Sequence, residues 1–373
     1  MAPRLRSRVK IAYYRGGSSK AVFFHEGDLP PPGAARDKLL KRVMGTPDPI
    51  QVDGLGGSRA ITSKIAIIRP SDRPDVDVDY TFAQVGVHQD VISYNVNCGN
   101  ISAAVGPFAI EEGLEVRIFH TGTQKILISH VPIANDGIPG EEGDFRMDAV
   151  PGSGAPILLD YRKTIGAARS RGLLPTQRAL DELEVAGRRV SITICDVANI
   201  TVFASAQDFG ISGHESASEL TGNLSLVEMV RELRGKAAQL VGMCLDWQQV
   251  DTQSPFLPMV VLASNTRLSA DSGHVASRLF LDNMCHESMA GTVAICTAAC
   301  SRVKDSLVYN LLDPEARSLN TLRIAHPLGE MPVAVHVEAG TADTMSPAFS
   351  SLSFIRSARR LMDGHAFVPS LPM

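Results

Sequence analysis

The sequence contains no long apolar run and no long run of one charge, and these absences exclude several classes of protein. No stretch of about 18 apolar residues occurs in the 373, so we expect no membrane span. The basic start at Arg4, Arg6, Arg8 and Lys10 is not followed by the apolar segment of roughly 7–15 residues that marks a secretory signal. With a net charge of −4, no basic block suits a nucleic acid. We expect a cytoplasmic protein with neither nucleic-acid nor membrane partners.

Paired cysteine motifs are missing as well. No CxxC pair and no zinc-ligand spacing occurs among the six cysteines, which are Cys98, Cys195, Cys244, Cys285, Cys296 and Cys300. We therefore expect reduced thiols and no metal site. Aromatic residues are scarce, whereas short β-branched runs bounded by Gly, Pro and Asp recur along the chain. These runs predict strands, and the sequence indicates a strand-rich α+β protein.

Helical periodicity is clearest in two segments, Asp37–Met44 and Leu226–Met243. The second segment begins with Ser225-Leu226-Val227-Glu228, which has the pattern of a capping box. Its apolar residues form one stripe, which predicts packing against a core.

A weak internal repeat divides the chain into two parts. The matches keep one order along the chain: Val9–Ala12 with Val190–Thr193, Ala21–Phe24 with Thr201–Ala204, and Cys98–Ile101 with Ala290–Val293. Their offsets are similar, at 181 (9 to 190), 180 (22 to 202) and 192 residues (98 to 290). The repeat predicts two related domains, residues 1–185 and 186–373, with a polar boundary near Asp181–Arg188.

The tetrapeptide Asn97-Cys98-Gly99-Asn100 lies between a strand-like stretch and the helix-like run Ile101–Val105. A cysteine in the first turn of a helix lies where free N–H groups and the helix dipole favour a thiolate. The glycine after it allows a ligand to approach the backbone. The same pattern also fits an inert buried cysteine. In the repeat, Ala290 takes the place of Cys98, so a symmetric pair of thiols is not available.

The second candidate group is Lys64. It is the last residue of the Gly-rich loop Gly54–Lys64, which leads into the apolar strand Ile65–Ile68. A lysine at the head of an apolar strand is partly desolvated, and desolvation disfavours its charged form, as a base requires. The alternative is a lysine at a strand end that reaches water. The loop is not a phosphate-binding P-loop, because GxxxxGK[ST] is absent.

Three segments together carry a family resemblance: Tyr14–Lys20 (YRGGSSK), Gly54–Lys64 (GLGGSRAITSK) and Asn97–Gly113 (NCGNISAAVGPFAIEEG). The chain resembles the PrpF-type 2-methylaconitate isomerases, a family that includes aconitate and methylitaconate Δ-isomerases and 4-oxalomesaconate tautomerases. The resemblance implies a diaminopimelate-epimerase-like fold, in which two similar α+β domains each wrap a sheet around a central helix. It places the active site in the cleft between the domains and implies that no cofactor is used.

Carried onto this chain, the resemblance makes Lys64 and Cys98 the acid/base pair. Carboxylates would be bound by Arg15, Ser18, Ser19, Gly57 and Ser58, and by the N–H groups of Gly99, Asn100, Gly291 and Thr292. His326 would lie near the cleft, and His120 replaces a family asparagine near the expected pocket. The acidic pair Glu111 and Glu112 is expected to be solvated.

The function expected is that of a cofactor-independent isomerase. It would shift or reorient the C=C double bond of a small unsaturated di- or tricarboxylate, by proton transfer through Lys64 and Cys98. Three alternatives stay open: a 4-oxalomesaconate-type keto–enol tautomerase, an amino-acid racemase or epimerase, and a non-catalytic carboxylate-binding accessory protein. The choice of base between Lys64 and Cys98 is also open, as is assembly into a homo-oligomer.

Overall fold

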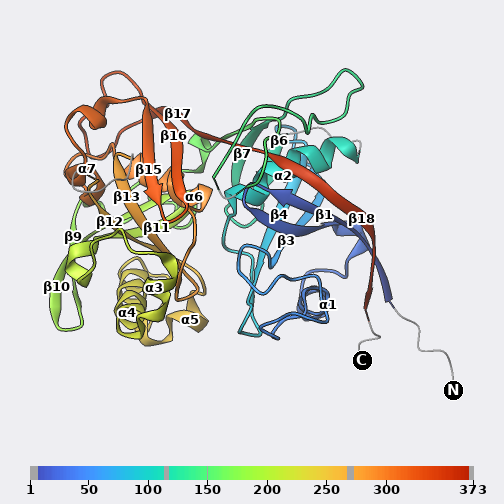
Figure 1. The fold of residues 1–373 in the computed structure, drawn as a ribbon, viewed down its shortest axis with the longest axis horizontal. Helices are drawn as coiled ribbons and strands as arrows, with labels where there is room; N and C mark the ends of the chain where they lie inside the picture. The colour runs from blue at the N-terminus through green and yellow to red at the C-terminus, as the bar shows by residue number, and fades with distance from the viewer. Residues whose placement is uncertain (1–6, 113–116, 149, 267–272, 369–373) are drawn as a thin grey trace. The chain divides into compact units, whose positions relative to one another are not determined.

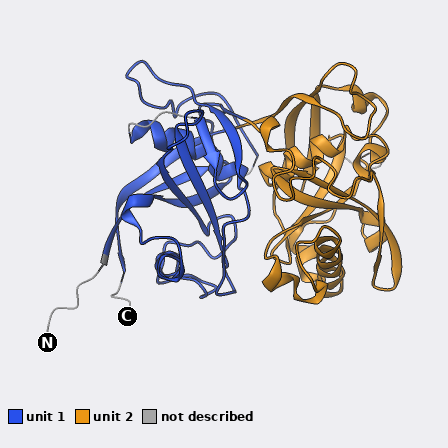
Figure 2. Cartoon of the chain, turned by 180° about the vertical axis from the view of Figure 1, so that it is seen from behind, with its two compact units in different colours: residues 1–159, 356–373 blue, residues 160–355 orange. Residues whose placement is uncertain are grey.

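The computed structural model describes residues 7–112, 117–148, 150–266 and 273–368 (Figure 1). The chain forms two compact units (Figure 2): unit 1 comprises residues 1–159 and 356–373, and unit 2 comprises residues 160–355. The division falls before the boundary expected between residues 185 and 186, and the end of the chain returns to unit 1. It returns because β18 (Ala358–Val368) pairs antiparallel with β1 (Ser7–Gly16) over the whole length of β1. Gly113, the last residue of the third family motif, lies outside the described residues.

Unit 1 contains a mixed sheet with the strand order β18-β1-β2-β3-β4-β6-β7, and β5 adds to β4. The pairs β2–β3 and β4–β6 are parallel, and the others are antiparallel. A parallel pair needs a crossover, and α1 supplies it between β2 and β3. The elements are β2 (Ser19–His25), η1 (Glu26–Asp28), α1 (Ala34–Met44), β3 (Lys64–Pro70), β4 (Val78–Val85), β5 (Ile92–Ser93), α2 (Gly99–Glu111), β6 (Arg117–His120), β7 (Lys125–His130) and β8 (Ile157–Asp160), the last reaching into unit 2.

Unit 2 repeats this arrangement, with the order β9-β10-β11-β12-β13-β15-β16 and β14 added to β13. Again two pairs are parallel, β11–β12 and β13–β15, and β17 extends the sheet beside β16. The strands are β9 (Asp181–Val185), β10 (Arg188–Val197), β11 (Asn199–Ser205), β12 (Met259–Ser264), β13 (Val275–Leu281), β14 (Met284–Cys285), β15 (Thr321–His326), β16 (Gly329–Val337) and β17 (Phe349–Arg356). The helices are η2 (Arg162–Thr164), η3 (Ala206–Phe209), α3 (Ala217–Gly222), α4 (Leu224–Leu240), η4 (Trp247–Gln249), α5 (Val250–Gln253), α6 (Gly291–Cys300), α7 (Leu307–Leu311) and η5 (Glu315–Ser318).

Each unit has one central helix that is buried on all sides. In α2 every residue from Gly99 to Ala109 is buried, and in α6 every residue is buried. A helix that is apolar around its whole circumference is stable only inside a core. Accordingly, α2 packs on β1, β2, β3, β6, β7 and β18, and α6 packs on β10, β11 and β16. The expected fold class, α+β with a sheet wrapped around a central helix in each of two similar parts, is confirmed.

The capping box expected at Ser225 is wrong. Helix α4 begins at Leu224, and its N-cap is Asn223, whose side chain accepts a hydrogen bond from the backbone N–H of Leu226. Asparagine is among the strongest N-cap residues, so the helix starts before Ser225. A complete capping box does occur one helix earlier, at Ser216 and Glu219 of α3.

The expectation that the acidic pair at the end of α2 is solvated is wrong. Glu111 accepts hydrogen bonds of 2.6 Å from both the Tyr14 hydroxyl and Arg360. Glu112 is ion-paired with Lys10 and Arg360, and each glutamate side chain is only 15% exposed. These contacts tie the end of the central helix to β1 and β18. Within the described ranges, no helix has the length and apolarity needed to cross a membrane.

Candidate active site

Lys64 is the first residue of β3, between Ala21 of β2 and Gln84 of β4. It is only 5% exposed, so the solvent-reaching alternative is wrong. Burial lowers the pKa of Lys64, and Cys98 opposes part of this shift through its charge and a side-chain hydrogen bond. A lowered pKa favours the neutral amine, which is the form that can accept a proton.

Cys98 is the N-cap residue of α2, with an extended backbone (φ −122°, ψ 101°). Its side chain makes no capping hydrogen bond to the helix, and it is partly exposed. It interacts instead with the side chain of Lys64. The two candidate groups are therefore neighbours within unit 1, at a helix end where negative charge is favoured.

Asn100 joins the start of α2 to the turn between β1 and β2. Its amide nitrogen donates to the hydroxyls of Ser18 and Ser19, at 3.1 and 3.3 Å. Its oxygen accepts a hydrogen bond of 2.9 Å from Nε of Arg356. Gly17 lies in this turn at φ +51°, and a Cβ there would come within 2.3 Å of the Asn100 oxygen. The turn can therefore approach the helix only because glycine occupies this position.

Arg15 lies beside the same turn. Its Nη1 donates to the backbone oxygens of Gly17 and Ser357, at 3.1 and 2.9 Å, and to the Ser357 hydroxyl. Burial, followed by the charge of Arg359, lowers the pKa of Arg15. Within the described residues, Nε and Nη2 of Arg15 make no hydrogen bond, and they are the groups able to hold a carboxylate.

The Gly-rich loop is organised by Gln51, which sequence reasoning missed. This side chain is 1% exposed, and its oxygen accepts hydrogen bonds from the Ser58 N–H at 2.9 Å and the Ser63 hydroxyl at 2.7 Å. Ser58 is exposed at φ +64°, and its hydroxyl donates to Ile50. A Cβ on Gly57 would come within 2.5 Å of Thr62, so the loop is closely packed there.

Gln84 is the second residue that sequence reasoning missed. Its oxygen accepts a hydrogen bond of 2.6 Å from Nζ of Lys64. Its nitrogen donates to the backbone oxygens of Ala60 and Ser63, at 3.2 and 3.1 Å. The signal available in the sequence was one amide side chain within an otherwise apolar stretch, Phe82–Val85, which by itself indicates no chemistry.

His120 ends β6 and is 1% exposed. Burial lowers the pKa of His120 to about 3. Its Nδ1 accepts the Thr123 N–H at 3.0 Å, so the neutral ring carries its proton on Nε2, which has no protein partner within the described residues. His120 lies opposite Tyr80, four residues along β4 from Gln84. At about 3.3 Å per residue, this places it roughly 13 Å from the strand position that faces Lys64.

The residues expected in unit 2 occupy positions equivalent to those of unit 1. Gly291 and Thr292 begin α6 as Gly99 and Asn100 begin α2, and a Cβ on Gly291 would come within 2.5 Å of the Phe354 ring. The Thr292 hydroxyl accepts a hydrogen bond of 2.9 Å from Asn199, the first residue of β11. Asn100 also bonds to the first residue of its strand, Ser19 of β2, but there the helix residue is the donor.

The candidate pair, Lys64 and Cys98, is not repeated in unit 2. Thr201 pairs with Met259 at the start of β12, as Ala21 pairs with Lys64 at the start of β3. The N-cap of α6 is Ala290, where the N-cap of α2 is Cys98. The chain therefore carries the lysine and the cysteine once, in unit 1. The two histidines do correspond, because His326 ends β15 as His120 ends β6.

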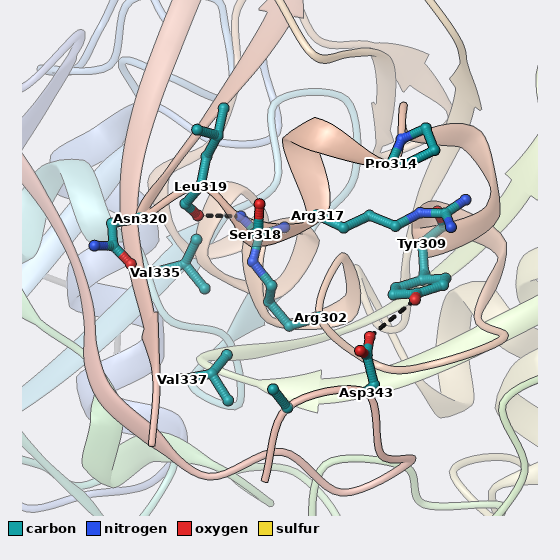
Figure 3. Close-up of a pocket in the computed structure, with 11 residues that line it drawn as sticks. Arg302, Tyr309, Pro314, Arg317, Ser318, Leu319, Asn320, Val335, Val337 and Asp343 are labelled. Carbon is teal, nitrogen blue, oxygen red and sulfur yellow. Dashed lines mark hydrogen bonds between the residues drawn. The ribbon is translucent and has the colours of Figure 1, made fainter. Parts of the chain in front are cut away.

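Unit 2 also contains a cavity of about 390 Å³ that holds none of these residues (Figure 3). It is lined by Arg302, Tyr309, Pro314, Arg317, Ser318, Leu319, Asn320, Val335, Val337, Ala342 and Asp343. Arg302 donates to the backbone oxygen of Leu319 at 2.7 Å, and the Tyr309 hydroxyl donates to Asp343 at 3.0 Å. Burial lowers the pKa of Arg302 to about 10. These polar groups therefore make hydrogen bonds to other residues that line the cavity.

The described residues contain no group of three or more His, Cys, Asp or Glu side chains arranged to hold a metal ion. All six cysteines have free thiols.

Comparison with known proteins places this chain in a family. The chain matches the PrpF protein family over residues 6–369. It is 37% identical to the 3-methylitaconate isomerase of Eubacterium barkeri, over 97% of each chain. It is 35% identical to the 4-oxalomesaconate tautomerase of Pseudomonas putida, over 96% of each chain. The chain belongs to the PrpF family, and it is an enzyme of the isomerase class.

Solved structures agree with this assignment. The crystal structure of methylitaconate-delta-isomerase is similar, with a TM-score of 0.77 and 36% sequence identity, over 98% of this chain and 96% of that one. A hydroxyproline epimerase from Agrobacterium vitis shares the fold, with a TM-score of 0.58 at 11% identity, over 99% of this chain and 94% of that one. The fold is therefore the diaminopimelate-epimerase-like fold named in the sequence analysis.

Proposed function

We propose that this enzyme moves or reorients the C=C double bond of a small unsaturated di- or tricarboxylate, with Lys64 and Cys98 as its proton-transfer groups and without a cofactor. The observation that carries the proposal is the position of a buried lysine beside a cysteine at the N-terminus of α2. The names of the relatives agree with this substrate class, since they are isomerases or tautomerases of methylitaconate and oxalomesaconate.

The reaction begins with removal of a C–H proton next to the double bond. The neutral amine of Lys64 takes this proton and becomes an ammonium group, and the electron pair spreads through the double bond to a carboxylate. The Cys98 thiol then gives a proton to the far carbon and becomes a thiolate. Because Cys98 acts directly on Lys64, the ammonium can return its proton to the thiolate, and the pair is then reset. The opposite direction exchanges the two roles.

The developing charge needs preorganised donors. The backbone N–H groups of Gly99 and Asn100 lie in the first turn of α2, where a helix has no internal acceptors for them. Arg15, Ser18, Ser19 and the loop at Gly57 and Ser58 supply further polar groups in unit 1. Each such donor contributes roughly 10²–10³-fold to the rate when it contacts the oxyanion. Gly291, Thr292, His120 and His326 stay predictions of the sequence.

Incubation in D2O with a panel of unsaturated acids tests the proposal. The panel contains aconitate, methylaconitate, methylitaconate and oxalomesaconate, and proton NMR follows both isomer ratio and deuterium uptake. We expect at least one acid to isomerise with deuterium at the carbon that gains the proton. Proline and hydroxyproline serve as controls for racemase chemistry, and we expect no exchange at their α-carbons because Ala290 replaces a second thiol. Exchange in the amino acids alone, or in no acid at all, contradicts the proposal.

A keto–enol tautomerase is the second candidate, favoured by the oxalomesaconate tautomerase relative. The same panel separates the two. Turnover of oxalomesaconate without turnover of the acids that have no keto group assigns tautomerisation rather than double-bond migration.

A further inference from the structure

The carboxamide of Gln84 is fixed at both of its ends. Its nitrogen faces the backbone oxygens of Ala60 and Ser63, which can only accept hydrogen bonds. This assigns the amide orientation, so the oxygen must face Lys64, whose Nζ lies 2.6 Å away. Because Gln84 is only 3% exposed and lies directly opposite Lys64 in the β3–β4 register, solvent does not compete for this contact.

The groups around Lys64 determine whether its amine is charged. Among the described residues, the titratable side chain that acts on Lys64 is Cys98, at the N-cap of α2. Phe82 presents its ring on the same face of β4, with its centroid 5.4 Å from Nζ. Gln84 accepts a hydrogen bond but carries no charge. A carboxylate at the same point would favour the ammonium form, and an apolar side chain would leave the amine unoriented.

Unit 2 provides an internal comparison at the three equivalent positions. Lys64 corresponds to Met259 and Cys98 to Ala290. The register of β12 and β13, with Val260 opposite Phe280, brings Met259 opposite Leu281, so Leu281 corresponds to Gln84. The same strands and the same central helix thus form with Met, Leu and Ala in place of Lys, Gln and Cys. The fold does not require a buried amide at this position, and burying one is costly unless it is bonded.

We infer that Gln84 is a positioning residue of the enzyme, which orients Nζ of Lys64 toward Cys98 and the substrate and keeps the amine available to accept a proton. The inference rests on the proposed role of Lys64 as an acid/base group. It extends that role to a neighbour that need not touch the substrate.

Two substitutions at position 84 separate orientation from charge. Gln84→Glu keeps the shape but adds a negative charge, and we expect it to move the rising limb of the kcat/KM–pH profile up by about one pH unit or more. Gln84→Leu copies the residue of unit 2, and we expect kcat to fall about 10–100-fold with little change in KM. The matched control is Gln124→Glu, which adds the same charge at an exposed position of unit 1 and should keep the wild-type profile.

A readout without substrate keeps the test independent of the proposed function. In protein labelled with ¹³C-lysine, the Cε–Hε signal of Lys64, assigned by its loss in Lys64→Met, reports protonation directly. We expect its midpoint to rise in Gln84→Glu and not in Gln124→Glu. If the wild type turns over none of the acids, the proposed function fails while this titration still decides the role of Gln84. The inference is overturned if Gln84→Glu leaves the Lys64 titration unchanged, or if a folded Gln84→Leu has wild-type kcat.

Discussion

Nε of Arg356 donates a hydrogen bond of 2.9 Å to the side-chain oxygen of Asn100, a residue 256 positions earlier in the sequence. Both side chains are buried. The bond fixes which end of the Asn100 amide faces Ser18 and Ser19, because its oxygen is already engaged. The amino group is thereby directed to Ser18 and Ser19, and the first turn of α2 is held by the segment that re-enters unit 1.

Asn100→Asp tests this arrangement. The aspartate can still accept from Arg356, but it cannot donate to Ser18 and Ser19. It also places a negative charge where we propose that the substrate carboxylate binds. We expect KM to rise about 10–100-fold, which corresponds to roughly 1–3 kcal/mol for a lost charged contact. Steady-state kinetics with the best acid of the panel measures it. Asn310→Asp, at an exposed position, is the control, and an unchanged KM in Asn100→Asp would remove Asn100 from the binding groups.

The close approach of Gly17 to Asn100 gives a prediction about stability. Alanine at position 17 would be destabilised in two ways. Its backbone would be left-handed (φ +51°), and its Cβ would lie within 2.3 Å of the Asn100 oxygen. Gly187, in the β9–β10 hairpin, has φ +73°, and a Cβ there would meet no atom within 4 Å. Gly187→Ala should therefore cost about 1–2 kcal/mol for the backbone alone, and Gly17→Ala should cost at least about 1 kcal/mol more. Urea unfolding of the two variants compares the costs, and equal destabilisation would contradict the close contact.

His120 makes the stability of unit 1 depend on pH. Its pKa is lowered by burial to about 3, below its ordinary value of 6.5. Between these values the unfolded chain binds a proton that the folded chain does not, so the free energy of unfolding falls as the pH falls from 6.5 toward 3. The contribution approaches about 1.4 kcal/mol per pH unit. Urea unfolding from pH 7 to pH 4 should give a shallower slope for His120→Asn than for the wild type. His88→Asn, at an exposed position, should keep the wild-type slope, and equal slopes in all three proteins would show that His120 is protonated when folded.

Local sequence patterns predicted much of the fold. The repeat at offsets of 180 and 192 residues corresponds to the equivalent strands and to the central helices α2 and α6. A helix that is apolar on all sides must be buried, and in each unit the sheet wraps around it. The return of β18 to β1 was not predictable, since its pairing depends on partners some 350 residues apart and β18 alternates partly exposed side chains without a strong apolar signal.

The candidate site likewise contains residues that the sequence predicted and residues that it did not. Cys98 precedes Gly99 at the start of a helix, and Lys64 ends the Gly-rich loop that begins at Gly54, so both could be chosen as candidates from local sequence. Gln51 and Gln84 could not be found, because an amide acquires its role only from the backbone groups that the fold brings to it. The expectation for Glu111 and Glu112 failed for a related reason, since their partner Arg360 lies on the returning strand.

The most direct test of the account is solvent exchange by single variants of the proposed acid/base pair. Lys64→Ala and Cys98→Ser, each checked for folding by circular dichroism, are incubated in D2O with the acid that the wild type isomerises, beside the exposed control Lys163→Ala. We predict that both variants lose about 10²–10⁴-fold in turnover and in deuterium incorporation, while the control keeps wild-type rates. Near-normal turnover in Lys64→Ala would contradict the central claim that a buried lysine and its neighbouring cysteine carry the proton.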